Sequence, residues 1–367
     1  MLKYNPRFSA SRKLFKLTVF KLIATIFIFI SFYITKTNSQ SINITNLPNE
    51  IKLYIRDDLP VFGENTNGRW SGFCAVFGHE LQKELRQLSN NPNFTVSINA
   101  TQNKTSDKFR LDGLITDDKK LKYDIQCGPN SKGILEFLEQ EGMPQYKERI
   151  IESNIFYETN IKLLIRKKVW ENFNLKNKLP QEILDILKKK LNVGVVEKTT
   201  TQEQLSQHFT GIKLFKSLDD ATIAFNEGMP GEKEMDALAS DGIIVKYKSD
   251  HYCHPRKPCV IYPENNQVSL GTQEQKYFIA ISNYGGTQQY SATLQETINN
   301  LIDRSNVIRK EIEKLKQYEN ERHWEPLIPL ILTGVVFLIF AIVKYRNAIG
   351  NSVSKFVRRI LSPFTNR

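Results

Sequence analysis

Apolar and polar residues alternate along this chain in two periods, which predict strands and helices in turn. Short apolar runs bounded by turn residues predict strands at Lys52–Arg56, Tyr123–Cys127, Ile161–Ile165, Val193–Val196 and Tyr277–Ser282. Apolar residues at helical spacing predict helices at Gly78–Leu88, Leu179–Leu187, Leu218–Asn226 and, as one long amphipathic helix, after Ser291. Alternating strands and helices indicate an α/β fold with mixed sheets.

Other segments lack such periodicity. The stretch from Asn90 to Asp107 is polar and rich in Asn, so we expect a loop or a weak hairpin there. The pair Gly128–Pro129 is a breaker and predicts the end of the preceding strand. Residues 309–325 are highly charged, which is typical of a solvated stalk.

An apolar segment near the C-terminus predicts a membrane span. Pro326–Val343 is 18 residues long without a charge, close to the ~20 residues that cross a hydrocarbon core. Trp324 and Tyr345 bracket it as interfacial residues do, and basic residues follow. We therefore expect a transmembrane helix at 326–345 and a basic cytoplasmic tail at 346–367.

The N-terminal apolar run, Leu22–Ile34, is only 13 residues long and follows a basic segment. That length favours a secretory signal over a span. We interpret residues 1–40 as a signal peptide cleaved near Ser39, with an uncleaved signal-anchor as the alternative. In both cases the basic flanks place the main domain outside the cytoplasm, in the periplasm or extracytoplasmic space.

The net charge of +12 belongs to the two ends of the chain. Residues 1–40 carry seven Lys or Arg and residues 344–367 carry six, with no acid in either segment. Without these thirteen, 38 basic residues face 39 acidic ones. Because binding to phosphates needs clustered cations, the body of the chain gives no support for nucleic acid as a partner.

The four cysteines allow three disulfide pairings, and the residues alone do not choose among them. Cys253 and Cys259 are close enough in sequence to close a short loop. The same segment, with His251 and His254, also has the ligand types of a zinc site. An oxidising compartment favours the disulfide, so we expect no metal.

Three stretches in a fixed order carry a resemblance to a known family. They are Tyr54–Phe62 with Gly68–Phe73, then Val193–Glu203, then Glu234–Asp241. In this order and spacing the chain, over roughly residues 45–305, resembles the type II periplasmic solute-binding proteins, of the amino-acid-binding family that also provides the ligand-binding core of ionotropic glutamate receptors.

The resemblance implies a two-lobed clamp followed by the C-terminal transmembrane helix. Its first lobe would comprise residues 41–158 and 275–308, and its second lobe residues 159–274. Two crossing strands near 156–160 and 272–277 would join the lobes. The family fold, together with sequence proximity, favours the disulfides Cys74–Cys127 and Cys253–Cys259.

A clamp for a small polar solute needs an apolar wall, donors for an anion and an acid for an amine. Phe62 and Trp70 are the candidate wall, and Asp58 lies in the same loop region. Thr199 and Thr200, at a predicted helix start, are candidate partners of an anion. The resemblance assigns Asp241 to the α-ammonium of the ligand.

The carboxylate clamp departs from the family pattern, which has a Thr followed shortly by an Arg. This chain has Cys127-Gly-Pro-Asn-Ser-Lys-Gly133 and no Arg there. Gly128, Asn130, Ser131 and Lys132 are the residues available in its place. Since lysine lacks the planar fork of arginine, the ligand is a polar solute for which an α-amino acid is one candidate.

The sequence therefore predicts a membrane-anchored solute-binding protein that captures a small polar, amino-acid-like ligand, for uptake with an ABC permease. The alternative is a receptor ectodomain that signals through its transmembrane helix to a sensor partner. No nucleophile elbow, phosphate-binding Gly loop or metal-binding helix motif occurs, so we predict neither an enzyme nor a cofactor.

Overall fold

The structure is a computed structural model that describes residues 48–56, 59–100, 111–116, 122–227, 235–264, 268–283 and 288–321. Asp58, the signal segment 1–40, the predicted span 326–345 and the tail 346–367 lie outside these residues. Within the described part, no helix is long and apolar enough to cross a membrane. The chain divides into two compact units, Met1–Ile312 and Glu313–Arg367, and the sheets described below all lie in the first.

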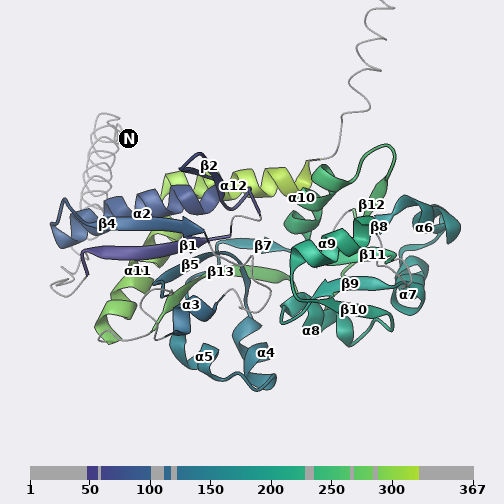
Figure 1. The fold of residues 1–367 in the computed structure, drawn as a ribbon, viewed down its shortest axis with the longest axis horizontal. Helices are drawn as coiled ribbons and strands as arrows, with labels where there is room; N and C mark the ends of the chain where they lie inside the picture. Colours follow the sequence, from purple (N-terminus) through teal and green to yellow (C-terminus); the bar gives the residue numbers. More distant parts are fainter. Residues whose placement is uncertain are drawn as a thin grey trace, which may run out of the picture. The chain divides into compact units, whose positions relative to one another are not determined.

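The first lobe is built on a six-stranded mixed sheet with the order β4-β1-β5-β13-β6, in which β7 also pairs with β13 (Figure 1). Its strands are β1 (Glu50–Ile55), β4 (Thr95–Ala100), β5 (Ile125–Ser131), β6 (Ile150–Glu152), β7 (Tyr157–Thr159) and β13 (Gln275–Ser282). β1 is parallel to β4 and β5, and β13 is antiparallel to its neighbours. A separate hairpin joins β2 (Glu64–Thr66) to β3 (Arg69–Ser71).

The second lobe is built on a five-stranded sheet with the order β10-β9-β11-β8-β12. Its strands are β8 (Ile161–Arg166), β9 (Val193–Val196), β10 (Ile212–Phe215), β11 (Ala237–Asp241) and β12 (Cys259–Tyr262). β10, β9 and β11 are parallel, whereas β8 runs antiparallel to both β11 and β12. All five strands come from one continuous stretch of sequence, so this lobe is an insertion into the first.

Two antiparallel strands carry the chain between the lobes. β7 leads into β8 after Asn160, and β13 begins at Gln275 after the second sheet is complete. Gln275, Lys276 and Tyr277 pair with Thr159, Glu158 and Tyr157. Residues of this ribbon therefore lie at the junction of the two sheets.

Helices cover both faces of each sheet. Those of the first lobe are α2 (Phe73–Ser89), α3 (Asp112–Ile115), α4 (Ile134–Gln140), α5 (Gln145–Arg149) and α11 (Gln288–Arg304). Those of the second are α6 (Lys167–Asn172), η1 (Leu175–Asn177), α7 (Pro180–Lys190), α8 (Thr200–Ser206), α9 (Leu218–Glu227) and α10 (Gly242–Tyr252). α12 (Asn306–Asn320) follows α11.

The alternation of side chains along β13 assigns the helices of the first lobe to its two faces. Phe278 and Ala280 belong to a core cluster with residues of α3, α4 and α5. Tyr277 points the other way, and its ring lies 6.2 Å from Phe156, which stacks on Phe73 of α2 at 4.6 Å. Burial of apolar side chains on both faces of a sheet is the main stabilising contribution in such a fold.

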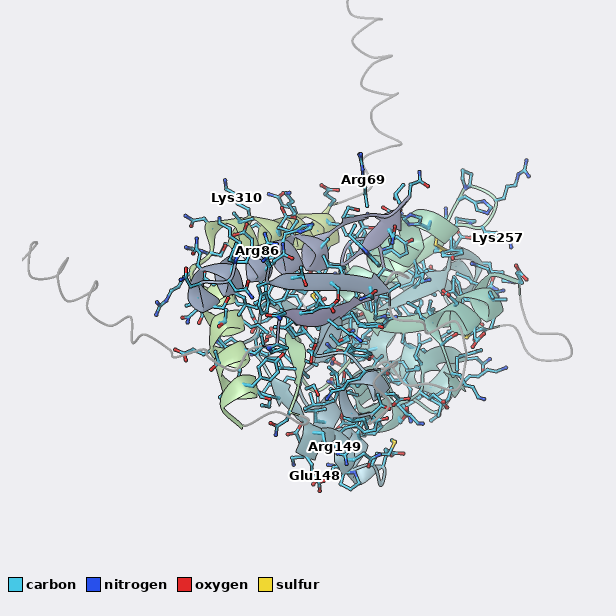
Figure 2. The ribbon with its side chains drawn as sticks, turned by 60° about the vertical axis from the view of Figure 1, so that its left-hand side comes forward. Arg69, Arg86, Glu148, Arg149, Lys257 and Lys310 are labelled. Atoms are coloured by element: carbon cyan, nitrogen blue, oxygen red, sulfur yellow. A yellow bond between two sulfur atoms is a disulfide. The ribbon has the colours of Figure 1, made fainter. Side chains whose placement is uncertain are left out.

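Both predicted disulfides are present, which confirms the pairing. Cys74 of α2 bonds Cys127 of β5, and Cys253 bonds Cys259. Because both sulfurs of the shorter loop are in a disulfide, Cys253 and Cys259 are not zinc ligands here. That loop is exposed and contains Lys257 (Figure 2), whose Nζ donates to the Asn226 carbonyl at 3.0 Å.

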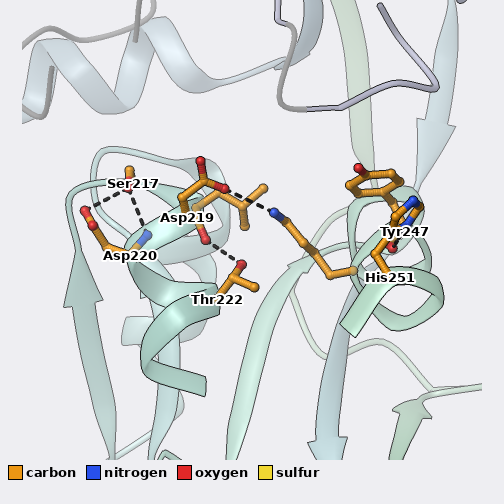
Figure 3. A network of polar contacts seen from close by, with 8 residues as sticks. Ser217, Asp219, Asp220, Thr222, Tyr247 and His251 are labelled. Atoms are coloured by element: carbon orange, nitrogen blue, oxygen red, sulfur yellow. Dashed lines mark hydrogen bonds and ion pairs between the residues drawn. The ribbon is translucent and has the colours of Figure 1, made fainter. Parts of the chain in front are cut away.

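A polar network connects α9 and α10, the helix that begins directly after Asp241 (Figure 3). Lys248 Nζ of α10 lies 3.3 Å from Asp219 Oδ1 of α9, and its side chain is almost fully buried. Ser217 caps α9, because its Oγ accepts from the backbone N–H of Asp220 at 3.0 Å. The Lys248–Asp219 ion pair therefore joins the first turn of α9 to α10.

Three local predictions were wrong. The polar stretch 90–107 contains a strand, β4, that pairs with β1 along six residues. β5 continues through Gly128–Pro129 to Ser131. The long helix after Ser291 is two helices, because Ser305 caps a new one by accepting from the backbone N–H of Ile308 at 3.3 Å.

Candidate functional site

Asp241 is the last residue of β11 and lies immediately before α10. Its side chain is only 5% exposed, within a strand whose five residues are all buried. The antiparallel register places it opposite Ile161, the first residue of β8 after the crossing ribbon. The carboxylate is therefore at the end of the second sheet that faces the first lobe.

Hydroxyl groups from both lobes bind this carboxylate. The Tyr277 hydroxyl, on β13 of the first lobe, donates to Asp241 Oδ2 at 2.5 Å. The Thr201 hydroxyl, on α8 of the second lobe, donates to Asp241 Oδ1 at 3.2 Å. Asp241 thus takes part in a direct polar connection between the lobes.

A second polar contact lies beside the first. Thr200 precedes Thr201 on α8, and its hydroxyl donates to Gln275 Oε1 at 2.5 Å. Gln275 is 1% exposed, and its Nε2 has no hydrogen-bond partner among the described residues. Because Gln275 and Tyr277 are two positions apart on one strand, they point to the same side of β13, toward the N-terminal turn of α8.

Thr199 has the local role that its position predicts. It is the N-cap of α8, and its Oγ1 accepts from the backbone N–H of Gln202 at 3.2 Å. Its own hydroxyl donates to the Val196 carbonyl at 2.7 Å. Gln202 completes the turn by accepting from the backbone N–H of Lys198 rather than from that of Thr199.

The segment predicted to replace the carboxylate clamp forms an irregular part of β5. Gln126 pairs with Ala280 and Asn130 with Phe278, so four positions of β5 match two of β13. Gly128 lies within this β-bulge. The Asn130 side-chain amide donates to Gln126 Oε1 across it, and Asn130 Oδ1 has no hydrogen-bond partner in the described part of the chain.

Ser131 and Lys132 follow the bulge. Ser131 is buried and lies directly opposite Tyr277 in the β5–β13 register, which places it next to the partner of Asp241. Lys132 is exposed, and its backbone N–H donates to the Lys276 carbonyl at 2.7 Å. Of this segment, Ser131 is therefore the residue that the register brings nearest to Tyr277.

The two aromatic candidates lie in different environments. The Phe62 ring is fully buried and 5.9 Å from the Tyr277 ring, among aromatic residues that line the crossing ribbon. Trp70 is half-buried on β3, in a hairpin whose turn residues Asn67 and Gly68 both have positive φ. Such an Asn-Gly turn matches the twist of a tight hairpin.

Acidic residues from both lobes face each other beside these contacts. α4 of the first lobe packs against α8 of the second. Burial raises the pKa of the Glu203 carboxyl on α8, and the negative charge of Glu136 on α4 raises it further. The same two causes, burial and then Glu136, raise the pKa of Glu152, whereas Lys132 opposes the rise. In both carboxyls the charge of Glu136 therefore adds to the effect of burial on the pKa.

Sequence reasoning missed two residues of this arrangement. Tyr277 was predicted as part of a strand and Gln275 as part of the crossing segment, but neither as part of a site. The alternation of Gln275 and Tyr277 on one side of β13 is the only sequence signal for them. Among the described residues, no group of three or more His, Cys, Asp or Glu side chains could hold a metal ion.

Comparison with known proteins gives a likeness of fold only. No protein-family model and no curated protein matches the chain. The arginine-, lysine-, histidine-binding protein ArtJ from Geobacillus stearothermophilus is similar with a TM-score of 0.50 and 15% identity, covering 76% of this chain and 99% of that one. The chain therefore has the two-lobed fold of the type II periplasmic amino-acid-binding proteins.

Two further solved structures are similar at lower scores. An ancestral arginine-binding protein bound to glutamine has a TM-score of 0.49 and 17% identity, with 75% of this chain and 100% of that chain covered. The GluR0 ligand-binding core in complex with L-glutamate has a TM-score of 0.47 and 16% identity, with 74% and 99% covered.

Proposed function

We propose that this chain is an extracytoplasmic solute-binding protein that captures a small polar ligand bearing an amine between its two lobes. Asp241 carries the proposal, because it is a buried carboxylate at the lobe junction with a hydroxyl donor from each side. A carboxylate has about four lone-pair positions and is a strong acceptor for an ammonium group.

Ligand capture in such a clamp is a shift in population between an open and a closed form. Contacts that a ligand makes with both lobes favour closure. In this proposal the Tyr277–Asp241 hydrogen bond, which also joins residues of the two lobes, acts in the same direction. The ligand ammonium would bind Asp241. Thr199 and Thr200 of α8, with the Asn130–Lys132 segment, would lie beside the acidic or polar end of the ligand. Phe62 and Trp70 would pack the apolar part of the ligand.

The shared fold supports this mode of binding, and the proposal extends to this chain the ligand class of the similar proteins, amino acids. Two disulfides fit an oxidising space outside the cytoplasm. In the full proposal, residues 326–345 anchor the clamp in the membrane, which raises its effective concentration beside an ABC permease.

The test is isothermal titration calorimetry of the purified chain against the common amino acids and matched organic acids that lack the amine. The proposal expects binding of at least one amine-bearing solute and weaker binding of its deaminated analogue. Binding of only the analogues, or of no solute in the panel, would contradict it.

A further inference from the structure

A concave pocket of about 750 Å³ lies on the second lobe, away from Asp241. It is formed by α6 and η1, by the start of α7, by the end of β12 and by Pro263, Glu264 and Val268. None of the residues that the proposed function assigns to ligand binding lines this pocket. Its volume falls within the range of roughly 300–1,000 Å³ that is usual for small-molecule sites.

The floor of the pocket is aromatic and aliphatic. The Trp170 and Tyr262 rings lie 5.6 Å apart at an angle of 46°. Tyr262 and Ile183 are buried, and Trp170, Val260 and Val268 are half-buried. Trp170 packs against the core of the lobe on one side and lines the pocket on the other. Two rings held in this way offer a surface on which a third ring can stack.

The uncharged polar groups of the pocket are the Tyr262 hydroxyl and the side chains of Asn174 and Asn177, and the Asn177 amide donates to Asn174 Oδ1 at 2.7 Å. The Tyr262 hydroxyl donates to the Pro180 carbonyl at 3.3 Å, which orients the phenol and leaves its oxygen able to accept a hydrogen bond. Burial raises the pKa of this hydroxyl, so it stays neutral at physiological pH. The phenol oxygen can thus receive an N–H group from a molecule on the floor.

Charges at the rim are balanced. Lys167 and Lys176 are matched by Glu171 and Glu264, and Lys167 Nζ lies 3.8 Å from Glu171 Oε1. All four residues are exposed, and ion pairs between exposed side chains contribute little to the free energy of folding. The rim therefore favours neither an anion nor a cation.

We propose that this pocket is a second binding site, for a small uncharged aromatic or heteroaromatic molecule that carries a ring N–H. The molecule stacks on Trp170 and Tyr262 and donates its N–H to the Tyr262 oxygen. The site is independent of Asp241 and does not rest on the function proposed above, since all its lining residues belong to the second lobe.

The test uses 5-fluoroindole as the probe and fluorine NMR of the full chain as the readout. We expect saturable broadening and a shift of the probe resonance with the unmodified protein. Trp170→Ala removes one stacking partner, and Val260→Phe fills the pocket from its floor. Each should weaken binding by about tenfold or more. Trp170→Ala loses an aromatic contact and its buried area, which together exceed about 1.4 kcal/mol, and Val260→Phe places a ring in the volume that the probe needs.

Two matched variants separate this site from the rest of the protein. Trp70→Ala removes another half-buried tryptophan, on the first lobe, and should leave the probe affinity unchanged. Asp241→Asn should also leave it unchanged, whatever its effect on a polar ligand. Circular dichroism confirms that each variant is folded.

The proposal is overturned if the unmodified chain shows no saturable binding of the probe at millimolar concentration. It is also overturned if folded Trp170→Ala and Val260→Phe variants bind the probe as well as the unmodified chain does. Equal weakening by Trp70→Ala would place the probe elsewhere and have the same consequence.

Discussion

The Tyr277 hydroxyl donates a hydrogen bond of 2.5 Å to Asp241 Oδ2, and these two residues belong to different lobes. Tyr277 lies on the strand that returns the chain to the first sheet, and Asp241 ends the strand of the second sheet that leads into α10. A ligand amine that binds Asp241 must therefore share this carboxylate with the Tyr277 hydroxyl or replace that hydrogen bond.

Asp241→Asn should weaken binding of an amine-bearing ligand by about 10–150-fold. The change removes the charge but keeps the shape, and a hydrogen bond to a charged group contributes roughly 1.5–3 kcal/mol. Calorimetry with the best ligand of the amino-acid panel measures the effect. Asp250→Asn is the matched control, because Asp250 is on α10, the helix that follows Asp241, and its carboxylate accepts from Lys246 Nζ at 2.7 Å. Equal affinities of the unmodified chain and Asp241→Asn would rule out Asp241 as the amine site.

Tyr277→Phe should favour the open form of the ligand-free protein. The variant keeps the ring that packs 5.9 Å from Phe62 and removes only the hydroxyl that joins the lobes. Small-angle X-ray scattering should therefore report a larger radius of gyration than for the unmodified chain.

Thr201→Val is the matched control for this prediction. It removes the other hydroxyl from Asp241, but Thr201 and Asp241 are in the same lobe, so closure should not change. An unchanged radius of gyration in Tyr277→Phe, or an equal increase in both variants, would contradict a role of this contact in closure.

The sequence predicts well those features that local chemistry determines. Thr199 caps α8 because its hydroxyl oxygen accepts a backbone N–H of the first turn, which any Thr at a helix start can do. The buried strand Val193–Val196 is continuous in apolar character and was predicted with its observed bounds. In both cases the signal is complete within a few residues.

Features that depend on distant residues could not be predicted in this way. β4 does alternate polar and apolar residues over Thr95–Ala100, but its Asn-rich surroundings hide this short pattern, and its pairing with β1 is what identifies it as a strand. β5 continues through Gly128–Pro129 because a β-bulge against β13 lies there. At a bulge the regular pattern of backbone hydrogen bonds is interrupted, so a Pro without an N–H is tolerated. The contact between Tyr277 and Asp241 spans 36 positions and arises only when the crossing ribbon brings the sheets together.

Loss of the Cys74–Cys127 disulfide should destabilise the protein more than loss of Cys253–Cys259. The first closes a loop with a sequence separation of 53 and the second one of 6. Chain-entropy arithmetic gives about 4 kcal/mol and about 2 kcal/mol. Urea unfolding of the two double Cys→Ser variants measures the difference, and each serves as the control of the other. A larger loss in the Cys253→Ser, Cys259→Ser variant would show that native contacts, rather than loop closure, dominate.

The acidic pair at the junction of the lobes predicts a pH dependence. Burial and the charge of Glu136 raise the pKa of Glu203 above 4.5, so the charged form of Glu203 is disfavoured in the folded protein. A raised carboxyl pKa means that the folded state binds the proton more tightly than the unfolded state. The contribution of this group is therefore most favourable at acid pH and is lost as the pH rises from 4.5 through the raised value.

Glu203→Gln should accordingly raise the thermal unfolding temperature at pH 7 and have no effect near pH 4, where Glu203 is already protonated in the folded protein. Glu148→Gln is the matched control, because Glu148 is an exposed residue of α5 (Figure 2). This variant should leave the unfolding temperature unchanged at both pH values. Since Glu203 and Glu136 are on opposite lobes, Glu136→Gln should lower the pKa of Glu203 and give part of the same stabilisation. Equal stabilisation by Glu203→Gln at both pH values would show that its effect comes from packing or helix propensity and that the charge of Glu136 does not act across the junction.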